Sequence, residues 1–419
     1  MIQTTDTVLL AIDNKRTSEL WSASDSVEEL RELCENLGYS ITNIEIQARE
    51  RPHPKFYVGS GKLQELKELY KESNIGLFVT DDDLTPLQHR TLEAELAVKV
   101  MDRTGIILEI FAMRANTKEA QLQVEFAQLT YLKPRLTRMW THLSRLGGGI
   151  GTKGPGEKQL EVDKRQIRNR MDTIKEKLLK IEKQRGLKRE RRQTTPILTG
   201  SIVGYTNAGK STLLNSMTES SVVAESKLFA TLDPTTKTFR IPSNEKVLLT
   251  DTVGFIQKLP NPLKTSFKAT LEEINEANFI LHVVDISNPN WESMLKTSEV
   301  LLEDLGANKI PTIYVFNKID LVTSPSTYDT IHNFHPNVCV SASKKESLSK
   351  LLDAIQKLLD VYQKEYVFRI PLNRMEIVHL LHQHGKVLEE EYEEIVTIKV
   401  KINKIIAEKI MGQLEKKRV

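Results

Sequence analysis

The stretch that decides the fold reads Ser201-Ile-Val-Gly-Tyr-Thr-Asn-Ala-Gly-Lys-Ser-Thr212. It follows an apolar run typical of a buried strand and contains the phosphate-binding pattern of two glycines followed by Lys210 and Ser211. Glycine lets the backbone turn tightly, so successive N–H groups can point at phosphate oxygens, and the helix expected near Lys210 adds its positive end. Lys210 can then reach the β- and γ-phosphates, and the Ser211 hydroxyl can ligate Mg²⁺. The stretch predicts a strand, a phosphate-binding loop and a helix.

Three further motifs follow strands expected farther along the chain. Asp251-Thr-Val-Gly254 supplies a carboxylate for the Mg²⁺ shell and an amide that can contact the γ-phosphate. Asn317-Lys-Ile-Asp320 offers a carboxylate that can accept two hydrogen bonds from guanine, which adenine cannot donate. Ser341-Ala-Ser343 can close over the base with backbone amides. Four motifs in this order, each at the carboxyl end of a strand, predict a doubly wound GTP-binding domain.

Residues 229–236 lie between the first two motifs, where a switch threonine is needed to ligate Mg²⁺ and contact the γ-phosphate. We expect Thr231 to do this rather than Thr235 or Thr236. The residues expected to act in catalysis are Lys210, Thr231 and Gly254, and those expected to ligate Mg²⁺ are Ser211, Thr231 and Asp251. The residues expected to bind GTP or GDP are Gly204, Tyr205, Thr206, Asn207, Ala208, Gly209, Lys210, Ser211, Thr212, Phe229, Ala230, Thr231, Leu232, Asp233, Asp251, Thr252, Val253, Gly254, Asn317, Lys318, Asp320, Ser341, Ala342 and Ser343.

One position departs from the pattern of Ras-like enzymes. Phe255 follows Gly254, where those enzymes carry a glutamine that orients the attacking water. Because a phenylalanine ring cannot orient water, we expect slow intrinsic hydrolysis and a partner or another residue that completes the site. Gln257, two residues farther on, is a weak candidate for that role.

Length and composition set the wider frame. The chain has 419 residues, so two to four domains are expected, and its 59 Lys and Arg nearly balance 56 Asp and Glu. Cys34 and Cys339 lie far apart in sequence in apolar surroundings, which favours two free thiols in a reducing compartment. No apolar run reaches membrane-spanning length, and no secretion signal is visible. We therefore expect a cytoplasmic monomer with no membrane span.

The chain divides by pattern into four parts, which together predict an α/β multidomain protein. Residues 1–115 read as an α/β domain, with strands at 8–12, 41–47, 75–80 and 105–111 and helices at 26–37, 62–72 and 87–97. Residues 196–364 form the GTP-binding domain, and residues 365–419 a small α+β domain. Gly59-Ser-Gly61-Lys62 could hold an anion and Asp81-Asp-Asp83 could hold Mg²⁺, but a turn and a solvated loop are the favoured interpretations. His379, His382 and His384 cluster without acidic or cysteine ligands, which disfavours a metal site.

Residues 116–195 change to a helical period. Apolar residues recur at spacings of three and four over 122–143 and again over 160–181, which predicts an antiparallel pair of long helices. The link at 147–156 has six glycines in ten residues, and residues 157–192 carry 14 Lys and Arg against 7 Asp and Glu. A basic arm tipped by a glycine-rich loop favours a nucleic-acid surface, RNA more than DNA, over a solvated helix face.

Four segments together resemble the HflX GTPases, namely residues 145–157, 204–211, 229–236 and 251–256. The resemblance extends over essentially the whole chain, and its most specific part is the glycine-rich segment, which generic GTPases lack. It implies a cytoplasmic GTPase that binds the large ribosomal subunit near the peptidyl-transferase centre and helps to split stalled or idle ribosomes. It also implies that Ser211 and Thr231 bind Mg²⁺ and that Phe255 belongs to the class of switches with a hydrophobic residue in place of glutamine.

Two hypotheses follow. In the first, the chain is a Mg²⁺-dependent GTPase stimulated by the large ribosomal subunit, and it acts in a stress response. In the alternative, it is a GTP-gated protein that binds or remodels RNA outside translation. Some members of the resembled family are also said to hydrolyse ATP through the N-terminal part, where no ATP motif is visible in this sequence.

Overall fold

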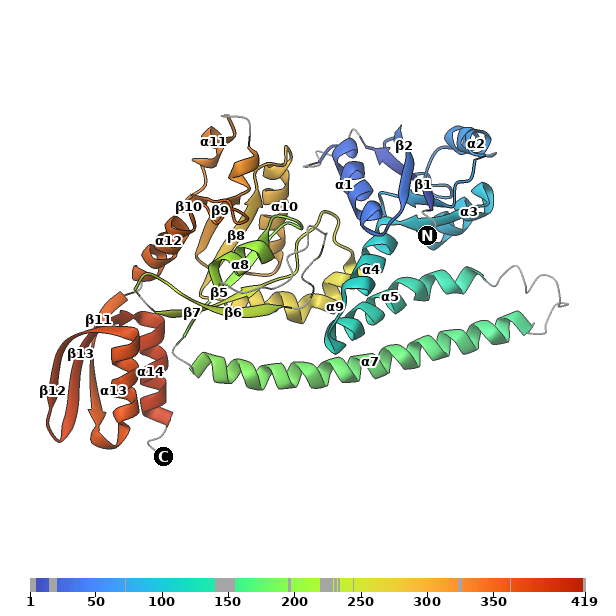
Figure 1. The fold of residues 1–419 in the computed structure, drawn as a ribbon. Helices are drawn as coiled ribbons and strands as arrows, with labels where there is room; N and C mark the ends of the chain where they lie inside the picture. Colours follow the sequence, from blue (N-terminus) through green and yellow to red (C-terminus); the bar gives the residue numbers. More distant parts are fainter. Residues whose placement is uncertain are drawn as a thin grey trace. The chain divides into compact units, whose positions relative to one another are not determined.

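In the computed structural model of this chain, the structure describes residues 5–14, 21–71, 73–139, 155–194, 197–218, 229, 232, 234–243, 245–322, 326–361 and 363–416. The chain forms two compact units. The first comprises residues 1–179 together with 227–233 and 256–268, and the second comprises the remaining residues. The predicted α/β multidomain class is confirmed, with three sheets (Figure 1).

The first unit is built on a four-stranded parallel sheet of order β2-β1-β3-β4. Its strands are β1 (Asp6–Asp13), β2 (Ser40–Ala48), β3 (Leu77–Thr80) and β4 (Lys99–Asp102), and its helices are α1 (Ala23–Asn36), α2 (Ser60–Leu69), α3 (Pro86–Leu96) and α4 (Arg103–Arg114). Thr85 and Gln88 form a capping box at the start of α3, with Pro86 in its first turn, so the local sequence fixes where this helix begins. Val8, Phe78 and Leu92 are fully buried in the core of the sheet domain.

The strand predicted at residues 105–111 is wrong, because these residues lie inside α4. The strand of this region is instead β4, just before the helix, where Asp102 accepts a hydrogen bond from the Gly105 amide and caps α4. Nearly every residue of that apolar run is buried, including Ile106 and Leu108 on different sides of the helix. A helix buried on all sides has no polar face, so its sequence reads like a buried strand.

The predicted helical pair consists of α5 (Lys118–Met139) and α7 (Pro155–Thr194) (Figure 1). Arg170 of α7 binds Glu125 of α5 through two hydrogen bonds of 2.6 and 2.7 Å, and Lys175 lies over the Phe126 ring. Met171 of α7 is buried in the seam. The glycine-rich link between the helices lies outside the described residues up to position 154.

The second unit contains a six-stranded sheet of order β10-β9-β8-β5-β7-β6, in which only β6 runs antiparallel to its neighbour. Its strands are β5 (Leu198–Gly204), β6 (Thr235–Arg240), β7 (Lys246–Asp251), β8 (Phe279–Asp285), β9 (Thr312–Asn317) and β10 (Asn337–Cys339). Its helices are α8 (Lys210–Thr218), α10 (Trp291–Asp304), α11 (Ser326–Ile331) and α12 (Leu348–Asp360), whereas α9 (Asn261–Leu271), which follows β7 in sequence, belongs to the first unit up to residue 268. Parallel neighbours bring the carboxyl ends of β5, β7, β8 and β9 to one edge, which is where ligands bind in such sheets.

The tail of the same unit forms an antiparallel sheet of order β11-β13-β12. It comprises β11 (Gln363–Pro371), α13 (Met375–His384), β12 (Gly385–Tyr392), β13 (Ile395–Asn403) and α14 (Lys404–Lys416). Its core, with Ile398 and Ile406, is continuous with the core of the six-stranded sheet. Among the described residues no helix is long and apolar enough to cross a membrane.

The buried Asp102 carboxylate should carry much of the stability of the first unit. It accepts hydrogen bonds from the Leu84 amide, the Tyr131 hydroxyl and the Arg135 guanidinium, besides capping α4. Asp102→Ala leaves Arg135 without its carboxylate, so we expect a loss of about 3–5 kcal/mol in the free energy of unfolding, measured in urea.

The matched control is Glu125→Ala, which removes the carboxylate of the exposed pair with Arg170. Because water screens that pair, the loss should be about 0–1 kcal/mol. Equal losses in the two variants would contradict the structural role assigned to Asp102.

Candidate nucleotide-binding site

The loop between β5 and α8 requires glycine at both glycine positions of the phosphate-binding pattern. Gly204 has φ 145°, and a Cβ there would lie 2.2 Å from the Val283 carbonyl oxygen. Gly209 has φ 92°, and a Cβ there would lie 2.2 Å from Nδ2 of Asn317. Side chains are excluded at both points by backbone conformation and by space. The loop therefore passes close to β8 and to the end of β9.

Two polar side chains predicted to serve the nucleotide begin α8. The Lys210 ammonium is buried and donates a hydrogen bond of 2.6 Å to the Tyr205 carbonyl oxygen. Burial lowers the pKa of Lys210 to about 8, although the Asp251 carboxylate opposes the shift. Ser211 donates a hydrogen bond of 2.7 Å to Oδ2 of Asp251 at the end of β7. A hydroxyl and a carboxylate oxygen thus meet beside the loop, and both are ligands that Mg²⁺ prefers.

The segment after β7 is joined to the loop by backbone hydrogen bonds. The Phe255 amide donates to the Gly204 carbonyl oxygen at 3.0 Å, and the Thr206 amide donates to the Phe255 carbonyl oxygen at 2.8 Å. The Phe255 ring is buried. A Cβ on Gly254 would lie 3.0 Å from the Lys210 ammonium nitrogen. Gly254 and the Lys210 ammonium therefore lie close enough for the Gly254 amide and Lys210 to contact the same phosphate group.

Asn317 connects the loop to the segment after β10. Its amide nitrogen donates to the Ala208 carbonyl oxygen at 2.8 Å, and its amide oxygen accepts from the Ala342 amide at 3.0 Å. Lys318 adopts the left-handed conformation, with φ 64°, and forms an ion pair of 2.6 Å with Asp285. Asn317 therefore links three segments at one edge of the sheet, namely the phosphate-binding loop, the motif that ends at Asp320 and the segment after β10.

Asp320 has a carboxylate oxygen that is suited to reading a base. Oδ1 is buried and has no hydrogen-bond partner among the described residues, while Oδ2 lies 3.4 Å from the Lys344 ammonium. A hydrogen bond from the Ser341 hydroxyl lowers the pKa of Asp320, and the nearby Lys344 ammonium lowers it further. An ionised carboxylate with a free acceptor can bind the N–H groups of guanine.

Three stretches of the chain match known families. Residues 24–112 match the family described as GTP-binding GTPase N-terminal, residues 114–192 that described as GTP-binding GTPase Middle Region, and residues 199–318 that described as 50S ribosome-binding GTPase. The chain is 44% identical to the GTPase HflX of Caldanaerobacter subterraneus, over 92% of this chain and 89% of that relative. It is 39% identical to the GTPase HflX of Escherichia coli, over 90% of this chain and 89% of that relative. The chain belongs to the HflX family of GTPases.

As an HflX GTPase, the chain binds GTP and hydrolyses it. The resemblance seen in the sequence is confirmed over nearly the whole chain. Among solved structures, it is similar to a GTP-binding protein from Sulfolobus solfataricus in complex with GDP, with 25% identity, a TM-score of 0.44 and coverage of 85% of this chain and 98% of that one.

The switch residues expected from the sequence are only partly described in this HflX GTPase. Ala230, Thr231 and Asp233 lie outside the described residues, so the expectation for Thr231 stays a prediction. Phe229 is buried in the first unit, where its ring lies 4.6 Å from that of Phe111 on α4. Leu232 is buried too, as a member of the same unit.

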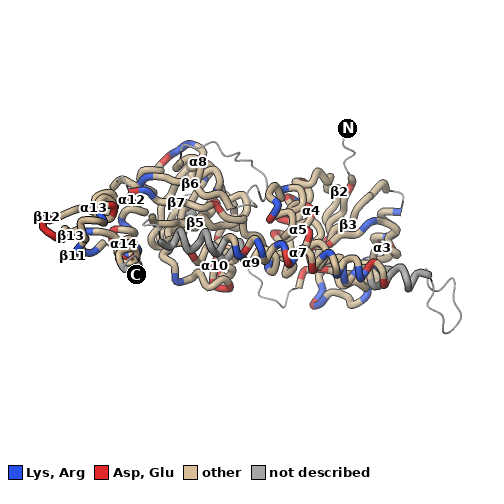
Figure 2. Tube along the Cα trace, turned by 90° about the horizontal axis from the view of Figure 1, so that it is seen from below, with Lys and Arg blue, Asp and Glu red and all other residues tan. Residues whose placement is uncertain are grey.

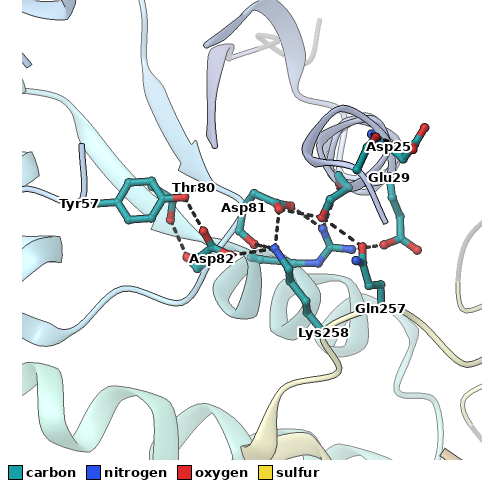
Figure 3. A network of polar contacts seen from close by, with 11 residues as sticks. Asp25, Glu29, Tyr57, Thr80, Asp81, Asp82, Gln257 and Lys258 are labelled. Carbon is teal, nitrogen blue, oxygen red and sulfur yellow. Dashed lines mark hydrogen bonds and ion pairs between the residues drawn. The ribbon is translucent and has the colours of Figure 1, made fainter. Parts of the chain in front are cut away.

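A polar network in the first unit involves the residues that follow the Asp251-to-Gly254 motif in sequence (Figure 3). The Lys258 ammonium donates to Asp81 at 2.7 Å and to Asp82 at 2.8 Å. Gln257 accepts a hydrogen bond of 3.1 Å from Ser26 on α1. Gln257, the weak candidate for orienting water, thus has its side-chain oxygen engaged by the N-terminal domain in this structure.

The same network answers whether residues 81–83 hold a metal. Arg103 donates to Asp81 at 2.6 Å, on the oxygen that Lys258 does not use. Burial alone would raise the pKa of Asp81, but Arg103 and Lys258 outweigh it and lower that pKa. Two side-chain cations occupy the place of a metal ion. Within the part of the chain that the structure describes, no group of three or more His, Cys, Asp or Glu side chains could hold a metal.

Several of these contacts have no recognisable signal in the amino-acid sequence. Lys258 and Asp81 are separated by 177 residues, and although Asp81 to Asp83 could be noted as a run of acids, nothing in the sequence pointed to Lys258 as its partner. His282 was also missed: it is buried in β8, and burial, together with the charge of Lys210, lowers its pKa to about 3. A neutral imidazole beside the loop keeps a second positive charge away from Lys210.

Asp320→Asn should change the base that the site prefers. The amide can donate to the 2-oxo group of xanthine, whereas it loses the charge-assisted bonds to guanine, each worth about 1.5–3 kcal/mol. We expect GTP affinity to fall by at least about tenfold and xanthosine triphosphate to become the better ligand, measured by competition against a labelled nucleotide. Asp353→Asn, an exposed change on α12, is the control and should keep the preference for guanine. Unchanged preference in Asp320→Asn would show that Asp320 does not read the base.

Proposed function

We propose that this GTPase acts on the large ribosomal subunit, that the subunit stimulates hydrolysis, and that the protein splits or rescues stalled or idle ribosomes. The observation that carries the proposal is the match of residues 199–318 to the family described as 50S ribosome-binding GTPase. The relatives named GTPase HflX align over about nine-tenths of this chain and about nine-tenths of their own length.

The four motifs are proposed to act on one guanine nucleotide. The amides of the loop and Lys210 bind the β- and γ-phosphates, Gly254 contacts the γ-phosphate, and Asp320 binds the base. Asn317 supports this assignment because it links the loop to the closing segment. Phe255 offers no group to orient water, so hydrolysis needs a further group from the bound partner.

Mg²⁺ is proposed to bind at Ser211 and Asp251, with Thr231 as a third ligand. The hydrogen bond of 2.7 Å between Ser211 and Asp251 supports the fit, because it brings two oxygen ligands together next to the phosphate-binding loop. When bound, the ion neutralises charge that develops on the phosphates.

The basic helix α7 is the proposed contact with ribosomal RNA near the peptidyl-transferase centre. Lys177, Lys180 and Lys183 are exposed on it. Figure 2 shows basic residues recurring along its described length, with acidic residues between them. Helix α7 follows the glycine-rich link in the sequence. A contact of that link with RNA is also proposed, on the basis of the sequence alone. An RNA outside translation is the alternative target.

Binding to purified large subunits should depend on the nucleotide. We expect co-sedimentation with a non-hydrolysable GTP analogue and much weaker co-sedimentation with GDP. GTP turnover of the isolated protein should fall well below the common enzymatic range of about 1–10³ s⁻¹ and rise when large subunits are added. Equal binding in both nucleotide states, or turnover that large subunits leave unchanged, would favour the alternative target.

The charge of α7 should affect binding to RNA but not binding to GTP. Replacing Lys177, Lys180 and Lys183 by glutamine should weaken binding to large subunits and flatten its salt dependence by up to about 0.7–0.9 log units per lost phosphate contact. GTP affinity should stay unchanged. The control replaces Lys350, Lys357 and Lys364, exposed lysines of α12 and β11, by glutamine. Equal salt slopes in the two variants would exclude α7 as the contact.

A further inference from the structure

A cavity of about 810 Å³ lies between the six-stranded sheet and the C-terminal sheet of the second unit. Residues from the adjoining ends of β6 and β7, from α12 and α13, and from β12 and β13 line it. None of the four nucleotide motifs contributes to its lining. Four of its lining residues are cations, namely Arg240, Lys246, Lys386 and Lys401.

These cations face each other across strand pairs. Arg240 lies directly opposite Lys246 in the antiparallel ladder of β6 and β7. Lys386 lies directly opposite Lys401 in the ladder of β12 and β13. Like charges in directly opposite positions destabilise a sheet. The cavity therefore brings together two pairs of like charges from two different sheets, and of these four cations Arg240 has a further interaction partner.

Carboxylates compensate these charges only in part. Among the described residues, Lys246, Lys386 and Lys401 form no ion pair with an acidic side chain. Of the acids in the lining, Glu245 has its pKa raised to about 7 by burial and by the neighbouring Asp360. Glu245 is thus only partly ionised near neutral pH, and together with Asp360 it makes two carboxyl groups in the lining against four cations.

A buried histidine in the lining lacks a partner. His384 is only 5% exposed, and its Nδ1 has no hydrogen bond within the described part of the chain. Burial lowers the pKa of His384, and the charges of Lys246 and His379 add to the effect. Buried polar nitrogens in folded proteins are nearly always bonded, so this one points to a group that the described residues do not supply.

We propose that this cavity binds a phosphate group between the Arg240–Lys246 and Lys386–Lys401 pairs. Phosphate accepts charge-assisted hydrogen bonds from several cations at once, so the two like-charged pairs could serve as ligands of one anion. The volume is within the range of sites for small organic ligands, about 300–1,000 Å³. The phosphate can therefore come from a small phosphorylated molecule or from the backbone of RNA. The proposal does not rest on ribosome binding.

The test compares thermal unfolding of three proteins in saturating GDP, with and without inorganic phosphate at constant ionic strength. The wild type should gain about 2–4 °C in Tm at saturating phosphate. Lys386→Ala with Lys401→Ala should lose this gain, and its Tm without phosphate should equal or exceed that of the wild type because the repulsion is gone. Lys357→Ala with Lys364→Ala removes the same charge outside the cavity and should keep the gain. Equal gains in all three proteins, or no gain in the wild type, would overturn the proposal.

A second arm identifies the source of the phosphate. A short fluorescent single-stranded RNA is titrated into the same three proteins by anisotropy. Several-fold weaker RNA binding in the cavity variant alone, with competition by inorganic phosphate in the wild type, assigns the site to an RNA backbone. Equal RNA binding in the three proteins, with the phosphate effect on Tm lost only in the cavity variant, assigns it to a small phosphorylated ligand.

Discussion

The nucleotide site depends on the hydrogen bonds of one buried side-chain amide. Asn317 donates to the Ala208 carbonyl oxygen and accepts from the Ala342 amide, so it joins segments that follow β5, β9 and β10. Its nitrogen also occupies the space where a side chain of residue 209 would lie, at 2.2 Å from a Cβ on Gly209. Glycine is thus required there by the neighbouring motif as well as by the phosphate. The phosphate-binding loop, the Asn317 motif and the segment after β10 are therefore structurally coupled, because Asn317 bonds to the backbone of the other two.

The position after Gly254 shows a second constraint. In Ras-like enzymes this residue orients water, whereas here Phe255 is buried and its backbone is bonded to Gly204 and Thr206. The residue therefore fixes the segment against the loop. The next residues belong to the first unit, where Lys258 binds two carboxylates after β3. The chain that follows the γ-phosphate motif is consequently bonded to the N-terminal domain, and in this structure the Gln257 side chain lies against Ser26.

Sequence patterns predicted the parts whose requirements are local. The glycines, Lys210, Ser211 and the turn at Thr85 could be read because each is required by the backbone or ligand beside it. The strand expected at residues 105–111 is wrong, because this stretch of α4 is buried at nearly every position and shows no helical period. Contacts such as that of Ser26 with Gln257 join residues 231 positions apart, and no pattern in one sequence encodes them.

Lysine side chains in this protein occur in two different electrostatic environments, one with carboxylate partners and one without. Lys258 is partly buried, yet two carboxylates outweigh the effect of burial and raise its pKa. Because the chain has nearly as many acidic residues (56) as basic ones (59), its composition alone does not predict lysines that lack an acidic partner. Lys386 and Lys401 nevertheless stand opposite each other on adjacent strands, beside a histidine with an unbonded nitrogen. Both lysines are exposed, so water screens much of their repulsion, and the observation that favours a ligand over a solvated surface is the buried Nδ1 of His384.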